Sequence, residues 1–223
     1  MAATVYDSIA GSNFSVSPDF VAPGATASAP PQIERGDTVT LAGSDRVLET
    51  IVFPFRNRGA SATADLSVTF YNVGTDGLPL PFGSVFASVD FDQELFTGRS
   101  NGSSFFKTLD FTSEGIVLPD TFAVTFNITN RTDVPTDPSD DGTFGTAGDG
   151  VAEDFDTFWG DVVLGASTDG YLVRESSTVF DTVDPGFSTT EANFRMRITA
   201  IPEPMSVTFG AAMLGLVTMR RRR

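Results

Sequence analysis

The sequence predicts an all-β protein: a single antiparallel β-sandwich, jelly-roll-like, followed by a short C-terminal hydrophobic helix. Runs of alternating apolar and polar residues recur along the chain, and clusters of Gly, Pro, Asn and Asp separate them. Comparable helical periodicity is missing before the last twenty or so positions. Since 223 residues can form one well-cored domain, we expect the sandwich over 1–200 and a separate segment over 201–223.

The alternation is clearest in four segments, each with one apolar and one polar face, as in half-buried antiparallel strands. The aligned apolar residues are Ile51, Phe53 and Phe55, then Leu66, Val68 and Phe70, then Phe122, Val124, Phe126 and Ile128, and finally Phe194, Met196 and Ile198. Further strands are expected at 4–7, 37–42, 83–91, 104–111, 158–165 and 170–176. About ten short strands of this kind favour two packed sheets.

Two long segments between the strands are predicted to be loops. Residues 17–36, "SPDFVAPGATASAPPQIERG", are rich in Pro, Ala and Ser, and we expect an irregular or flexible connection there. Residues 133–157 are rich in Asp and Gly, and we expect an acidic loop.

Charge and composition exclude several classes of function. The chain has 29 acidic and 14 basic residues, for a net charge of −15, which disfavours binding to nucleic acid. It contains neither Cys nor His. Disulfides, thiolate or imidazole metal sites, Cys nucleophiles and Ser-His-Asp triads are therefore excluded.

The C-terminal segment combines a rigid motif, an apolar run and a block of positive charge. Met205–Met219 would form a helix about 22 Å long, a marginal membrane anchor beside a hydrocarbon core of about 30 Å. The arginines that follow would stay on the cytoplasmic side, which leaves the body outside. Because "MAATVYDSIA" contains no export signal, we expect that signal upstream of Met1. The alternative is a cytosolic protein that ends in a packed amphipathic helix.

This order of features resembles the PEP-CTERM sorting signal of Gram-negative bacteria. The matching residues are Pro202, Glu203 and Pro204 as the recognition motif, and Arg220, Arg221, Arg222 and Arg223 as the terminal cluster. The resemblance implies recognition by an exosortase, a membrane-embedded cysteine transpeptidase, and processing near the motif. It also implies transient anchoring in the inner membrane, a final location at the cell surface or outside the cell, and an organism that makes exopolysaccharide.

The body is also similar to a β-sandwich often found in front of this signal. The similar pieces include "TVYD", "RGDTVTLAGSDRVLETIVFPF", "VTFYNVGTDGLPLPFGSVF", "VLPDTFAVTF" and "DTFWGD". The resemblance spans most of residues 4–200 and implies no catalytic residues.

The acidic loop contains a candidate calcium site. Asp137, Ser139 and Asp141 alternate before Gly142, as in half of a Ca²⁺-binding loop, and Asp149 lies one step beyond the closing position. Oxygen ligands without His suit Ca²⁺ better than a transition metal. The alternative is a solvated acidic loop without a metal.

A second candidate site is the aromatic pair Phe158 and Trp159 at the end of that loop. An exposed aromatic platform beside carboxylates can bind a sugar by stacking and hydrogen bonding. The alternative is that Trp159, the single Trp of the chain, belongs to the core.

These observations favour an exported, non-catalytic β-sandwich protein, processed by an exosortase and associated with the extracellular polysaccharide matrix. A carbohydrate-binding module is the alternative, and a secreted glycosidase is a further one because it needs only two carboxyl groups. No cofactor is certain from the sequence, and Ca²⁺ is the candidate. The expected partners are the exosortase and exopolysaccharide. We expect no binding to nucleic acid.

Overall fold

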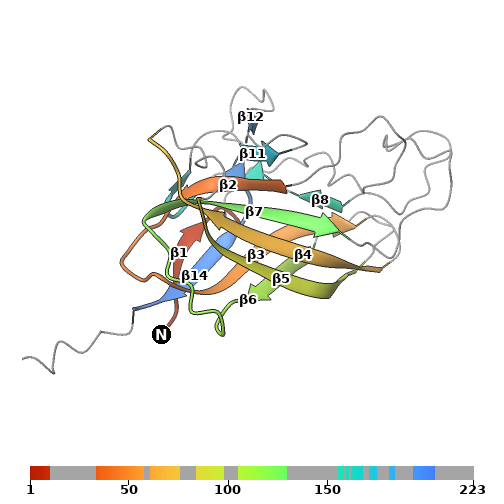
Figure 1. Ribbon diagram of the computed structural model, residues 1–223, viewed down its shortest axis with the longest axis horizontal. Helices are drawn as coiled ribbons and strands as arrows, with labels where there is room; N and C mark the ends of the chain where they lie inside the picture. Colours follow the sequence, from red (N-terminus) through yellow and green to blue (C-terminus); the bar gives the residue numbers. More distant parts are fainter. Residues whose placement is uncertain are drawn as a thin grey trace, which may run out of the picture.

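The computed structural model describes residues 1–10, 34–57, 61–75, 84–97, 105–129, 155–157, 159–160, 162–167, 171–174, 181–183 and 193–203 (Figure 1). The regular elements of this part are all strands, as the sequence predicts. They are β1 (Ala3–Asp7), β2 (Glu34–Thr40), β3 (Val47–Asn57), β4 (Ala62–Tyr71), β5 (Val85–Phe96), β6 (Phe105–Asp110), β7 (Thr121–Thr129), β8 (Phe155–Thr157), β9 (Trp159–Gly160), β10 (Ala166–Ser167), β11 (Tyr171–Arg174), β12 (Asp181–Val183), β13 (Asn193–Phe194) and β14 (Arg197–Ile201).

The strands form two antiparallel sheets in the order of a jelly roll. The five-stranded sheet has the order β1-β14-β3-β6, with β8 also paired to β3. The seven-stranded sheet has the order β12-β11-β2-β7-β4-β5, with β10 also paired to β2. If β14 is counted eighth after β1 to β7, these orders become 1-8-3-6 and 2-7-4-5, which are the two sheets of a jelly roll. The predicted all-β, jelly-roll-like sandwich is therefore confirmed.

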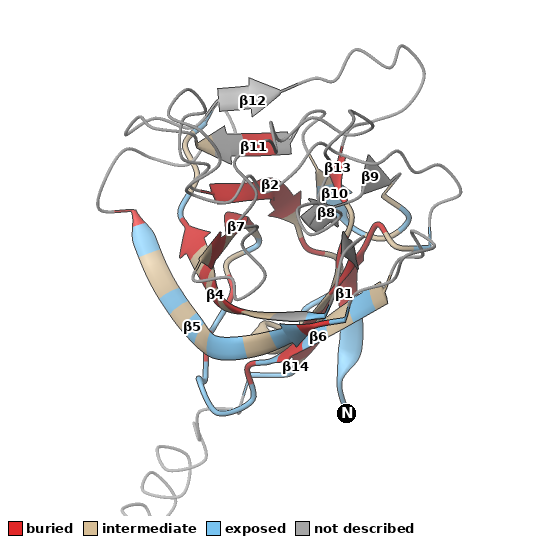
Figure 2. Cartoon of the chain, turned by 90° about the vertical axis from the view of Figure 1, so that its right-hand side faces the viewer, coloured by how far each residue is buried: buried red, intermediate tan, exposed pale blue. Residues whose placement is uncertain are grey.

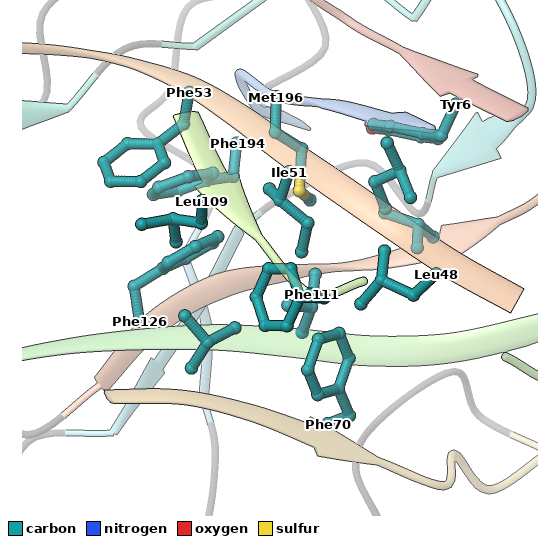
Figure 3. Packing of buried hydrophobic residues seen from close by; sticks show 14 of the residues in the cluster. Tyr6, Leu48, Ile51, Phe53, Phe70, Leu109, Phe111, Phe126, Phe194 and Met196 are labelled. Carbon is teal, nitrogen blue, oxygen red and sulfur yellow. The ribbon is translucent and has the colours of Figure 1, made fainter. Parts of the chain in front are cut away.

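The apolar faces of the two sheets meet in a core rich in phenylalanine (Figures 2 and 3). Phe126 of β7 and Phe194 of β13 stack with their ring centroids 5.0 Å apart. Phe53 of β3 lies 4.9 Å from the Phe126 ring, so both sheets and the short strand β13 share one aromatic cluster. The apolar sets that the alternation places on one face are all buried here. The two-residue period of the sequence therefore predicts the core correctly.

A sandwich of two sheets is open along the two sides where the edges of the sheets face each other. On one of these sides, an ion pair joins the edge strands β5 and β6. The Lys107 ammonium of β6 pairs with the Glu94 carboxylate of β5 and donates to the Leu95 carbonyl oxygen at 3.3 Å. A bulge in β5 precedes Glu94, because Gln93 adopts φ 52° and its backbone N–H donates to Asp65 Oδ1 at 2.9 Å. We call this the β5/β6 side.

The loop predictions need correction at one end each. Glu34, Arg35 and Gly36 lie in β2, although the sequence assigns them to the loop 17–36. These residues adopt strand conformation because they pair with β7 and β11. Similarly, β8 takes the last three residues of the predicted acidic loop 133–157 by pairing with β3. Of the strand expected over 158–165, two residues form β9. The remainder of both loops lies outside the described residues.

Candidate functional site

The end of β14 is the point where the predicted sorting motif leaves the folded body. β14 lies between β1 and β3, and both neighbours pair with it in register along most of its length. Ile201, its last residue, is half-buried opposite Val47, whereas Pro202 and Glu203 directly after it are exposed. The first two residues of the motif therefore follow a central strand without any spacer.

Arg46 fixes the backbone around this exit. Its backbone N–H donates to the Ile201 carbonyl oxygen at 3.2 Å, and its own carbonyl accepts from the Leu118 N–H at 2.8 Å. Its guanidinium donates to the carbonyl oxygens of Gly43 and Asp45, both at 2.9 Å. The same group pairs with Asp120 Oδ1 at 2.6 Å. One side chain therefore ties the 43–46 turn to the 111–120 segment, while its backbone holds the last residue of β14.

The rest of the predicted signal lies outside the described residues. Pro204 and Arg220, Arg221, Arg222 and Arg223 belong to this part, as does the expected helix over Met205–Met219. Within the residues that the structure describes, no helix is both long and apolar enough to cross a membrane.

A buried carboxylate on the outer face of the seven-stranded sheet organises a polar cluster. Glu34 Oε2 accepts hydrogen bonds from the Tyr71 and Thr125 hydroxyls, both at 2.7 Å. Its second oxygen pairs with the Arg174 guanidinium. Burial, followed by the hydrogen bond and the negative charge of Glu34, raises the pKa of Tyr71 well above its usual range. Tyr71 is thus held as a neutral hydrogen-bond donor.

The close approach of β2 and β7 at this cluster requires a glycine. A Cβ added at Gly36 would lie 1.8 Å from the Val124 carbonyl oxygen. The Glu34 cluster also fastens β11, because Arg174 is the last residue of that strand and Leu172 packs with Tyr71 and Ala123. The arrangement supports the attachment of β11 to the sheet.

A second buried carboxylate joins β2 to the short strands β10 and β13. Asp37 is fully buried, and its oxygens accept from Ser167 Oγ at 2.7 Å and from the Phe194 N–H at 2.9 Å. The Ser8 hydroxyl lies at the same strand and donates to the carbonyl oxygens of Phe194 and Met196, both at 3.1 Å. Asp37 and Ser8 therefore hold the strand β13 from two directions.

Asp7 completes this second open side of the sandwich. Its carboxylate accepts from the Ile9 N–H at 2.8 Å and pairs with the Arg197 guanidinium at 2.9 Å. Its backbone N–H donates to the Leu164 carbonyl at 3.0 Å. We call this region, with Asp37, Ser8 and Ser167, the β1/β2 side. Glu34, Asp37 and Asp7 thus each have partners within the fold.

The candidate calcium ligands Asp137, Ser139, Asp141 and Asp149 lie outside the described residues. Among the residues that are described, no group of acidic side chains is close enough to hold a metal ion. Both calcium binding and its alternative stay predictions.

Of the aromatic pair Phe158 and Trp159, the structure describes the backbone of Trp159. Trp159 lies in β9, opposite Phe194 of β13, and Phe158 is outside the described residues. A site for sugars at this pair stays a prediction.

Sequence reasoning missed the three buried carboxylates and their partners. For Glu34 the available signal was "ERGDTVT", in which charged residues continue into the apolar part of the strand without a turn motif between them. Sequence reasoning also missed the pair of Lys107 and Glu94, for which the available signal was rarity, because the chain has this lysine alone. Neither signal identifies the partner, since Glu34 and Arg174 are 140 positions apart.

Comparison with known proteins gives one distant structural likeness. No protein-family model matches the chain, and neither does any curated protein. A similar solved structure contains the cysteine protease and lectin-like domains of Cwp84, a surface layer associated protein of Clostridium difficile. The match has a TM-score of 0.45 and 13% identity and covers 77% of this chain but 32% of that one. A likeness this distant carries no argument about ligand or activity.

Proposed function

We propose that this chain is an exported, non-catalytic β-sandwich protein that an exosortase processes at its C-terminal segment, leaving the body at the cell surface or outside the cell. The observation that carries the proposal is the exposure of Pro202 and Glu203 directly after the central strand β14. A motif read by a membrane enzyme must be accessible and extended, and its two prolines favour an extended backbone. Cleavage there would leave all the strands that the structure describes intact, because β14 ends at Ile201.

The test is to express the complete gene, including any sequence upstream of Met1, in a host that has an exosortase. Cell fractions are then examined by mass spectrometry. We expect the body in the outer or extracellular fraction without the four C-terminal arginines. In the matched variant, Pro202, Glu203 and Pro204 are replaced by Ala, and the precursor should accumulate in the inner membrane. Recovery of the wild-type chain from washed cytosol with the arginines intact would refute the proposal.

A second candidate function is binding to matrix polysaccharide, and one exposed ring favours it. Phe106 of β6 is 60% exposed, whereas the other phenylalanines whose side chains the structure describes are buried or half-buried. It lies opposite Pro54 on the outer face of the five-stranded sheet, with exposed Thr108 two residues along the strand. An accessible ring with a hydroxyl side chain on the same face of the strand suits stacking against a sugar.

Co-sedimentation with insoluble polysaccharide from the host tests this second function. We expect Phe106→Ala to weaken the association about tenfold, the loss of one stacking contact. Leu95→Ala is the matched control, because Leu95 is a 57% exposed apolar residue on the neighbouring edge strand. Equal binding by the wild type and both variants would remove Phe106 as the contact. Quenching of Trp159 fluorescence by added sugars would support the aromatic pair instead.

A further inference from the structure

The tether between the sandwich and the apolar segment is very short. Ile201 is the last residue of β14, and the apolar run starts at Met205. Four backbone steps span at most about 14 Å. Under the proposed function, on which this inference rests, an enzyme that holds this segment in the membrane must therefore have the folded body against it.

The surface that surrounds the tether is rigid and partly apolar. Val117 is 52% exposed and forms a β-bridge with Val47, which in turn pairs with Ile201. The backbone of Arg46 bonds both to Ile201 and to Leu118, so this apolar group is fixed relative to the start of the motif. We name the surface formed by Asp45, Arg46, Val47, Glu114, Val117, Asp120, Ile201 and Glu203 the exit face.

The exposed charged side chains of the exit face are acidic. Glu114, Asp120 and Glu203 are exposed, and the Asp120 side chain keeps 83% exposure although it pairs with Arg46. Nearby Asp110 at the end of β6 accepts from the Thr112 hydroxyl and N–H, and these bonds lower its pKa and favour the charged form. Anionic lipid headgroups would repel such a surface, whereas a basic protein surface would attract it.

We propose that the exit face is the docking surface of this protein for the membrane peptidase, and that the peptidase presents there a basic rim around an apolar patch. Docking would add to the binding that the motif alone provides and would keep the motif within reach of the enzyme. Processing would then depend on side chains of the body that lie more than eighty positions before the motif.

Two valines of equal exposure allow a matched test. Val117 is 52% exposed on the exit face, and Val163 is 54% exposed beside Asp7 at the opposite end of β1. The full chain is expressed with the exosortase, and the rate of loss of the arginine tail is followed by pulse labelling. We expect Val117→Asp to slow processing about tenfold, as for the loss of one interface contact, and Val163→Asp to have no effect. Thermal melting of the released bodies checks folding, and Val117→Ser provides a milder variant if Val117→Asp folds poorly.

Charge reversal then separates a protein partner from a lipid surface. Glu114→Lys is compared with Asp92→Lys, since both carboxylates are exposed and Asp92 lies on the distant β5 edge. Docking to a basic protein surface predicts slower processing for Glu114→Lys alone. Faster processing, together with stronger binding to anionic vesicles, would mean that lipid faces this surface and would overturn the proposal. Identical rates for all four variants and the wild type would overturn it as well. Complete absence of wild-type processing would instead count against the proposed function.

Discussion

The two open sides of the sandwich are closed in different ways. On the β1/β2 side, fully buried Asp37 accepts from the distant Phe194 N–H, and Asp7 accepts from the Ile9 N–H of its own segment and pairs with Arg197 of β14. On the β5/β6 side, a half-buried ion pair between Lys107 and Glu94 joins two edge strands at the surface. Buried carboxylates with several partners stabilise more than exposed pairs do. The comparison indicates that the first side stabilises the fold and the second protects its edges.

The largest effect is expected for Asp37→Ala on the β1/β2 side. The change removes a fully buried carboxylate and leaves the Phe194 N–H and the Ser167 hydroxyl without that acceptor. We expect the free energy of unfolding to fall by about 3 kcal/mol. Urea unfolding of the body measures it. The control is Asp90→Ala on β5, where an exposed carboxylate accepts from Ser67 Oγ at 2.6 Å, and its cost should stay within about 0.5 kcal/mol. Equal costs for the two variants would contradict the comparison.

The second effect concerns Glu34, which lies in the same strand as Asp37 on the opposite face of the sheet. Glu34→Gln keeps the shape of the side chain and its bonds to Tyr71 and Thr125 but removes the charge that pairs with Arg174. We expect a loss of about 2 kcal/mol, because the guanidinium stays partly buried without its counter-ion. Hydrogen exchange should become faster in β11 before it does in β7. Uniform acceleration over the whole sheet would show that Arg174 does not fasten β11 locally.

The sequence predicts the core better than it predicts these polar contacts. Strict alternation places Phe53, Val68 and Phe126 correctly, because one face of each strand must be buried whatever its partner is. The same rule says nothing about Asp37, a charged residue that occupies an inward position of β2 between Arg35 and Val39. Its burial depends on Phe194, 157 positions away, and such a pairing follows from the topology. The resemblance of Pro202-Glu203-Pro204 to a sorting motif comes from the sequence alone and stays a prediction, whereas the exit face follows from the register of β14 with β3.

A smaller effect is expected for Tyr71 at alkaline pH. Burial and Glu34 raise its pKa in the folded state, whereas an unfolded tyrosine titrates near pH 10. The unfolded chain therefore loses the Tyr71 proton first, so this stabilisation is complete below about pH 10 and decreases as the pH rises above it. Tyr71→Phe should cost about 1 kcal/mol at neutral pH and make stability less dependent on pH between about 9 and 11. If Tyr71→Phe leaves the alkaline slope unchanged, Tyr71 ionises equally in both states.

The smallest effect on stability, and the sharpest test of the comparison, is expected for Lys107→Met on the β5/β6 side. The ion pair with Glu94 is partly solvated, and Met keeps the contact of the side chain with the Phe96 ring, so the loss should be about 0.5 kcal/mol. The inward-pointing lysine does more against edge-to-edge pairing, because a charge cannot be buried in an added strand. We therefore expect Lys107→Met to aggregate with increasing protein concentration, as measured by light scattering. Glu94→Gln breaks the same ion pair but keeps the lysine on β6, and it should stay monomeric. Aggregation of both variants would mean that the ion pair itself protects the edge, and a loss as large as that of Asp37→Ala would mean that both sides stabilise the sandwich alike.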